Sequence, residues 1–173
     1  MATAPFRFVA LNGSPSEVSK THAIAAHAVE IAGSGDVIDL GMLNANALLG
    51  RQPAEDVTNA LSAVEGATVL LLASPIYRAT FSGLLKVFLD QLPPHGLLTK
   101  ACILTCVGGS TFHSLAIDTG LRPLVASVDG WSVPTSLYAT PEDFDESGNL
   151  RERACSILEQ AIAEARLIIG AVD

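Results

Sequence analysis

A run of hydroxyl side chains precedes a predicted helix near the start of the chain. Residues 13–21 read Gly-Ser-Pro-Ser-Glu-Val-Ser-Lys-Thr and follow an apolar run that ends at Leu11. Free backbone N–H groups and the positive end of a helix dipole stabilise an anion at a helix start, where hydroxyls can add hydrogen bonds. These residues predict a phosphate-binding loop, with a Ser/Thr-rich helix cap as the plain alternative. The candidate ligands are Ser14, Ser16, Ser19, Lys20 and Thr21.

The same residues do not match two common nucleotide-binding loops. Serine stands at both glycine positions of a P-loop read from Ser14 to Thr21, and the apolar run that ends in Ala73-Ser74-Pro75 offers no acid for magnesium. The dinucleotide fingerprint Gly-x-Gly-x-x-Gly does not follow the first apolar run. A mononucleotide phosphate bound without a metal therefore fits better, and a P-loop kinase is a distant alternative.

Two more loops follow apolar runs in the same manner. Residues 74–78 read Ser-Pro-Ile-Tyr-Arg, where the proline restricts the backbone and the tyrosine offers a flat face. Residues 108–110 read Gly-Gly-Ser, and glycine lets a backbone approach a ligand closely. The first of these loops could equally be a turn with a surface tyrosine, and His113 could merely cap its own helix. The candidate ligands here are Pro75, Ile76, Tyr77, Arg78, Gly108, Gly109, Ser110 and His113.

The sequence offers no persuasive catalytic or metal-binding set. Its four histidines show neither metal-ligand spacing nor a Ser/His/Asp or Cys/His arrangement. Cys102 and Cys106 lie inside one apolar run with a spacing that suits neither zinc nor a redox motif. We therefore predict no catalytic side chain and no metal, and core packing for the cysteines.

Composition limits the possible partners. The 173 residues are 49% hydrophobic and 16% charged, which predicts a single domain over residues 1–173 with one buried core. A net charge of −8 opposes binding to nucleic acid or to an anionic membrane surface. No apolar run approaches the ~18 residues of a membrane helix. Residues 1–5 lack the features of a secretory signal, so we expect a cytoplasmic protein.

Apolar runs alternate with amphipathic segments along the whole chain. This alternation predicts an α/β fold with a doubly wound, five-stranded parallel sheet. In such a sheet all strands end at one edge, where ligands bind, so the three loops predict one shared site. The predicted strands are 6–11, 36–40, 67–73, 101–107 and 131–139, the predicted helices are 19–32, 54–64, 81–92, 110–128 and 150–169, and 41–53 is irregular.

Together these motifs resemble the flavodoxin-like NAD(P)H-dependent FMN reductases, including those that supply reduced flavin to sulfonate-degrading monooxygenases. The resemblance spans most of the chain and is carried by residues 13–16, 19–21, 74–86, 108–110, His113 and 121–123. It implies the strand order 2-1-3-4-5, FMN phosphate on the first loop, and the flavin ring between the second and third loops. It also implies a homodimer or homotetramer to which the helix at 81–92 contributes.

The resemblance implies that NADPH or NADH reduces FMN by hydride transfer from nicotinamide C4 to flavin N5. The cofactors carry that chemistry, which agrees with the lack of a catalytic side chain. An FMN-containing quinone or azo reductase and a flavodoxin-type electron carrier are the alternatives. Thr119 stands where several members that release their flavin carry an aromatic residue. Arg78 and Arg122 are candidates to bind a 2′-phosphate, and the choice between NADPH and NADH stays open.

Overall fold

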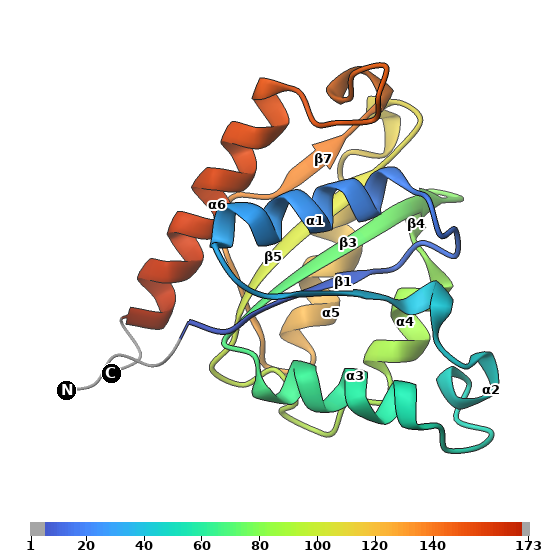
Figure 1. The fold of residues 1–173 in the computed structure, drawn as a ribbon. Coiled ribbons are helices and arrows are strands. Elements are labelled where there is room, and N and C mark those ends of the chain that lie inside the picture. The colour runs from blue at the N-terminus through green and yellow to red at the C-terminus, as the bar shows by residue number, and fades with distance from the viewer. Residues whose placement is uncertain (1–5, 171–173) are drawn as a thin grey trace.

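A parallel sheet forms the centre of the computed structural model, which describes residues 6–170 (Figure 1). Its strand order is β2-β1-β3-β5-β6, while β7 also pairs with β5. With β5 as the fourth strand and β6 and β7 sharing the fifth position, the predicted order 2-1-3-4-5 is confirmed. Residues 1–5, from which we expected a cytoplasmic protein, lie outside the described residues. The strands are β1 (Phe8–Asn12), β2 (Asp36–Asp39), β3 (Val69–Tyr77), β5 (Ala101–Val107), β6 (Trp131–Ser132) and β7 (Leu137–Ala139).

Helices cover both faces of the sheet. On one face lie α1 (Lys20–Ala32) and α6 (Glu152–Gly170) (Figure 1). The other face is covered by α3 (Glu55–Gly66), α4 (Gly83–Leu89) and α5 (Arg122–Ala126). Strands covered on both faces have no polar side, and this explains why β3 and β5 read as continuous apolar runs.

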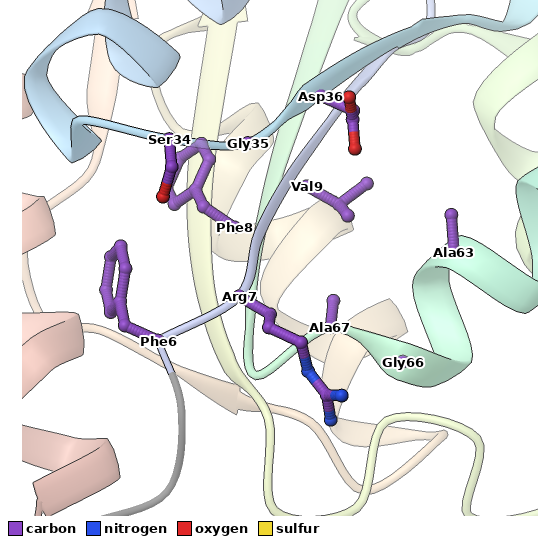
Figure 2. A pocket seen from close by; sticks show the side chains of 10 residues that line it. All are labelled: Phe6, Arg7, Phe8, Val9, Ser34, Gly35, Asp36, Ala63, Gly66 and Ala67. Atoms are coloured by element: carbon purple, nitrogen blue, oxygen red, sulfur yellow. The ribbon is translucent and has the colours of Figure 1, made fainter.

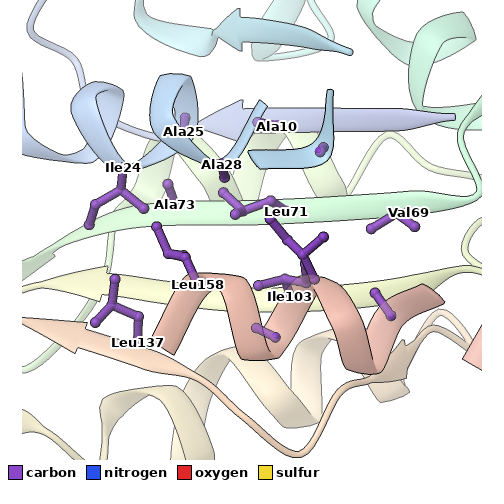
Figure 3. Packing of buried hydrophobic residues seen from close by; sticks show 14 of the residues in the cluster. Ala10, Ile24, Ala25, Ala28, Val69, Leu71, Ala73, Ile103, Leu137 and Leu158 are labelled. Carbon is purple, nitrogen blue, oxygen red and sulfur yellow. The ribbon is translucent and has the colours of Figure 1, made fainter. Parts of the chain in front are cut away.

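Alternate residues of β3 serve the two cores. Leu71 and Ala73 pack against α1 and α6, as Figure 3 shows, while Leu70 and Leu72 pack on the opposite face. All four are fully buried. Ala25 and Ala28 face the sheet from α1 (Figure 3), and such small side chains let the helix lie close above the strands. The core between the sheet and helices α1 and α6 therefore fixes the position of α1, and with it the loop that precedes α1.

The second strand-to-helix connection differs from the prediction. β3 continues to Tyr77 and turns back into the short antiparallel strand β4 (Thr80–Phe81). The predicted helix 81–92 begins at Gly83, because Phe81 pairs with Ile76 and the Ser82 hydroxyl accepts a hydrogen bond from the Leu85 amide as the N-cap. The helix ends at Leu89, ahead of the prolines at 93 and 94.

Proline breaks two other predicted elements. The predicted helix 110–128 consists of a 3-10 turn (Thr111–His113), a π-helical turn (Ile117–Leu121) and α5. Pro123 lacks the N–H that a regular helix needs, and the wider turn comes directly before α5. The predicted strand 131–139 is divided into β6 and β7 around Pro134, which cannot join a hydrogen-bonded ladder.

Short helical elements occupy other connections. The segment 41–53, predicted to be irregular, contains the short helix α2 (Ala45–Leu48), and a 3-10 turn (Leu40–Met42) precedes it. Asn44 caps α2 by accepting hydrogen bonds from the amides of Asn46 and Ala47. A further 3-10 turn (Pro141–Asp143) follows β7. The 3-10 turn Leu40–Met42 and α2 shape the connection that follows β2, at the carboxyl edge of the sheet.

A buried carboxylate stabilises the connection between β7 and α6. Asp143 accepts hydrogen bonds from Arg153 Nε and the Thr140 amide, both at 2.8 Å. Burial raises the pKa of Asp143, but the Arg153 and Thr140 hydrogen bonds together outweigh burial and hold the pKa below its ordinary value. The stabilisation is thus present above the pKa of the unfolded carboxyl and is lost as pH falls through the folded value.

Asp143→Asn is therefore expected to lower the free energy of unfolding by about 1–3 kcal/mol near neutral pH. The deficit relative to the parent protein should shrink in acid, where the parent loses the same interaction. Urea unfolding of both proteins across the acid range measures this, with the exposed neighbour Glu142→Gln as the control. An equal deficit at every pH would contradict the assignment.

Candidate functional site

Strand register brings the three predicted loops to one edge of the sheet. Asn12, the last residue of β1, pairs with Ala73 of β3, and Ala73 pairs with Thr105 of β5. The chain segments that follow these positions leave the sheet at its carboxyl edge, near the β4 hairpin in Figure 1. The Gly13 amide donates to the Ala73 carbonyl at 2.8 Å, which continues the ladder into the first loop.

Internal hydrogen bonds hold the first loop in shape. The Ser14 hydroxyl accepts from the Ser16 amide at 3.1 Å, and Ser14 is 3% exposed. Ser19 is the N-cap of α1 and accepts from the His22 amide at 3.1 Å. Thr21 is buried, and its hydroxyl lies 3.1 Å from that of Ser19. Ser14, Ser19 and Thr21 therefore build the loop, while Ser16 is exposed on it.

The first loop also presents free donors at the start of α1. The amides of Glu17, Val18 and Ser19 donate no hydrogen bond to any other residue within 6–170. These residues lie directly before α1, so their unpaired amides, beside the positive end of the helix dipole, form the kind of donor set that a phosphate requires. Lys20 is exposed, and its ammonium lies 5.6 Å from the centre of the Phe144 ring, a cation–π contact beside the loop. This donor set fits a phosphate monoester.

Asn12 is a site residue that the sequence analysis missed. It is fully buried, and its Oδ1 accepts from the Ser14 amide at 3.1 Å. Its Nδ2 donates to Asp39 Oδ1 at 2.7 Å, and His22 Nδ1 lies 2.8 Å from the same oxygen. One carboxamide thus connects the first loop to the end of β2. The signal in the sequence was a polar residue that ends an otherwise apolar strand.

The second segment is a hairpin rather than a simple loop. Pro75 and Ile76 lie half-buried in the extension of β3, and Tyr77 is 50% exposed. Arg78 and Ala79, which form the tip, have positive φ angles of 51° and 71°. The predicted loop residues 75–77 are therefore strand residues: Pro75 pairs with Val107 of β5, and Ile76 and Tyr77 pair with β4.

Ser82, also missed from the sequence, joins this hairpin to the first loop. Its hydroxyl donates to the Gly13 carbonyl at 2.7 Å, and its amide donates to Ser74 Oγ at 2.8 Å. A β-carbon on Gly13 would lie 2.9 Å from Leu85 Cβ, so the first loop packs directly on the start of α4. The two segments form one interlocked unit.

The third loop is held by Tyr138 of β7. The Gly108 amide donates to the Ala139 carbonyl at 2.9 Å, and a β-carbon on Gly108 would lie 1.9 Å from the Tyr138 hydroxyl oxygen. That hydroxyl donates to the Ser110 carbonyl at 2.9 Å, and burial raises the pKa of Tyr138, so it remains a donor at neutral pH. Gly109, Ser110 and His113 are exposed at the same edge.

Two other predicted positions lie beside the third loop. Thr119 is exposed in the π-helical turn, and its hydroxyl donates to the Leu115 carbonyl at 2.9 Å. Arg122 pairs with Asp118 at 3.0 Å and also donates to the Val133 carbonyl at 3.0 Å. Both ends of the Arg122 guanidinium are therefore engaged, by its own helical segment and by the connection between β6 and β7.

The cysteines belong to the core. Cys102 and Cys106 are fully buried in β5, and burial raises the pKa of each thiol to about 12. Both thiols are protonated at neutral pH and are poor nucleophiles. Cys155 is partly buried in α6.

The cavity in Figure 2 lies at the other edge of the sheet. It has a volume of about 350 Å³ and sits where β1 and β2 begin and α3 ends. None of the residues predicted to bind a ligand lines it, so it does not serve the candidate site, which is an exposed surface. The cavity is lined by Phe6, Arg7, Phe8, Val9, Ser34, Gly35, Asp36, Ala63, Gly66 and Ala67.

Among residues 6–170, no helix is long and apolar enough to cross a bilayer.

Comparison with known proteins identifies the family of this chain. Residues 6–145 match the family model described as NADPH-dependent FMN reductase. An FMN reductase (NADPH) of Pseudomonas aeruginosa is 32% identical over 97% of this chain and 95% of its own. The NADH-dependent FMN reductase SfnF of Pseudomonas fluorescens is 35% identical over 81% of this chain and 79% of its own.

A solved structure shares both the fold and the sequence. The apo form of the NADH:FMN oxidoreductase EMOB superposes with a TM-score of 0.81 at 34% identity, covering 94% of this chain and 89% of that one. The predicted flavodoxin-like fold and the resemblance stated from the motifs are thereby confirmed. This chain belongs to the NADPH-dependent FMN reductase family.

Proposed function

We propose that residues 1–173 act as a single domain that reduces FMN with NADPH or NADH at the carboxyl edge of the sheet. The observation that carries this proposal is the interlocked unit of the first loop and the β3–β4 hairpin. Its free amides at residues 17–19 lie at the start of α1, and the loop from Gly108 leaves the same edge. Three segments far apart in sequence can thus contact one flat, phosphorylated ligand.

The first loop would hold the phosphate of FMN. Ser14 and Ser19 shape the backbone, Ser16 and the free amides donate hydrogen bonds, and Thr21 supports the Ser19 cap. Lys20 adds positive charge beside the loop. Because a phosphate dianion binds best where donors are already oriented, the Asn12 and Ser82 hydrogen bonds to this loop support tight binding.

The hairpin and the third loop would hold the ring. Pro75, Ile76 and Tyr77 offer apolar contacts. The amides of Gly109 and Ser110, with His113 nearby, offer donors for the polar edge of the ring, while Gly108, whose own amide donates to Ala139, brings the backbone close to it. When bound, FMN would supply the redox chemistry, as the acceptor for hydride transfer from the nicotinamide. The protein aligns the two rings, which needs no acid, base or metal from the chain.

We further propose that the reduced FMN passes to a flavin-dependent monooxygenase in the cytoplasm, and that the chain works as a homodimer or homotetramer. The exposed side chains Phe112 (91%) and Leu115 (68%), beside the third loop, support a contact between subunits there. In α4, Leu85, Phe88 and Leu89 are buried in the chain's own core. The apolar side chains that α4 can still offer to a partner subunit are therefore those of Leu84 and Val87, which are partly buried.

Anaerobic mixing of the purified protein with FMN and NADPH or NADH tests the activity. The visible absorbance of oxidised flavin should fall with the nicotinamide absorbance, and the rate should rise with protein concentration. No decay above a protein-free mixture would reject the proposal. Turnover of quinone or azo dye with FMN permanently bound would favour those alternatives, and an FMN-bound protein inert to NAD(P)H would favour the electron carrier.

A further inference from the structure

The tip of the β3–β4 hairpin has an uncommon backbone. Both of its central residues, Arg78 and Ala79, have positive φ angles, which is the conformation of a type I′ turn between Tyr77 and Thr80. Asparagine, aspartate and glycine dominate such turns, because a β-carbon is unfavourable at positive φ. Neither residue here is of those types, so the tip keeps a conformation that its own residues disfavour.

The base of the hairpin is firmly held on two sides. Ser82 ties it to Gly13 of the first loop at 2.7 Å. On the other side, a β-carbon on Gly120 would lie 3.1 Å from the Phe81 ring, so the ring packs on the π-helical turn. With its base fixed, the tip extends from the carboxyl edge of the sheet, on the same side as the first loop (Figure 1). Strain maintained by surrounding contacts is common where a side chain has a functional position.

Arg78 is the cation left without a partner at this edge. It is exposed and makes no ion pair or side-chain hydrogen bond with another residue of the described chain. Of the other cations near the three loops, Lys20 lies beside the first loop, where we assign its charge to the FMN phosphate, while Arg122 is paired with Asp118 and Arg153 with Asp143. In a chain of net charge −8, a free arginine is the group available to attract a second anionic ligand.

We propose that Arg78 binds a phosphate of the nicotinamide nucleotide, and so sets the affinity for NAD(P)H without contributing to the affinity for FMN; this inference rests on the proposed function. The first loop has its own amide donors for the FMN phosphate, and the base of the hairpin, not its tip, is bonded to that loop. A dinucleotide stacked on the flavin carries its diphosphate, and in NADPH its 2′-phosphate, outward beyond the rings. Arginine suits either group, because its planar fork donates two parallel hydrogen bonds.

The test replaces Arg78 with glycine. Arg78→Gly removes the charge and relieves the positive φ, so the melting temperature should not fall. Isothermal titration of the FMN-loaded protein with NADP⁺ and NAD⁺ should give dissociation constants raised by about tenfold to a hundredfold, with a matching rise in KM. The dissociation constant for FMN should stay unchanged. If affinity for both nucleotides falls, Arg78 contacts the diphosphate. If affinity for NADP⁺ alone falls, Arg78 contacts the 2′-phosphate.

Two further variants separate charge from backbone. Ala79→Gly relieves the same kind of strain in the same turn without changing charge, and should bind both nucleotides like the parent protein. Arg78→Lys should recover part of the lost affinity. Unchanged nucleotide binding in Arg78→Gly, a weakened FMN affinity instead, or an equal loss in Ala79→Gly would each overturn the inference. The parent protein could bind FMN and NADP⁺ and yet fail to oxidise NAD(P)H. That result would reject the proposed function but not this inference, because the binding comparison would still decide the role of Arg78.

Discussion

Replacing Asn12 with leucine is expected to raise the dissociation constant for FMN by about 10- to 100-fold. Asn12 is buried at the end of β1, and its carboxamide contacts the Ser14 amide and Asp39 Oδ1. Leucine has a similar shape but offers neither donor nor acceptor. The Ser14 amide would lose its partner inside the protein, and the loop that we assign to phosphate would no longer be fixed.

The Asn12→Leu variant should also lose stability, by about 1–3 kcal/mol, because buried polar groups are left unpaired. Quenching of flavin fluorescence measures the affinity, and urea unfolding measures the stability. Asn44→Ala is the matched control: the Asn44 side chain caps α2 and bonds to no residue of the three loops, so its loss should cost about 1 kcal/mol of stability and leave FMN binding unchanged. Unaltered FMN affinity in Asn12→Leu would show that the first loop does not bind the phosphate.

The second large effect is expected from Gly13→Ala. The added β-carbon would lie 2.9 Å from Leu85 Cβ and 3.2 Å from the Ala73 carbonyl oxygen, and neither atom is at the end of a flexible side chain. The first loop must therefore shift away from α4, which would break the 2.7 Å hydrogen bond from Ser82 to the Gly13 carbonyl. We expect FMN affinity to fall about tenfold or more, because pre-oriented donors are lost.

Gly66→Ala provides the control for this substitution. Gly66 ends α3, its φ is not positive, and an added β-carbon would meet nothing within 4 Å. The control should bind FMN as the parent protein does and be at least as stable, since alanine restricts the unfolded chain. Equal FMN affinities for Gly13→Ala and Gly66→Ala would contradict the role given to the first loop.

The parts of the fold predicted from sequence are those set by local pattern. The unbroken apolar run around Leu70 and Leu72 indicated a strand covered on both faces, and the alternation of such runs with amphipathic segments indicated a parallel sheet, while the strand order came from the family resemblance. The hydroxyls before α1 were recognised because free amides at a helix start need such partners. These signals lie within a few residues of one another.

What sequence could not predict depends on contacts between distant segments. Ser82 appeared to lie inside a helix, and only its hydrogen bond to the Gly13 carbonyl, 69 positions away in sequence, reveals that it holds the first loop. The apolar spacing from Phe81 onward also suited a helix, although Phe81 pairs with Ile76 in a hairpin. Pro123 was visible, but the π-helical turn that accommodates it was not, because a helix can adapt to proline in several ways.

The structure of this chain with FMN bound tests the central claim most directly. The account predicts the FMN phosphate within hydrogen-bond distance of the free amides that follow Ser16, and the ring between the β3–β4 hairpin and the loop that begins at Gly108. A phosphate bound anywhere else, such as in the cavity beside Arg7 and Asp36 at the opposite edge of the sheet, would contradict it.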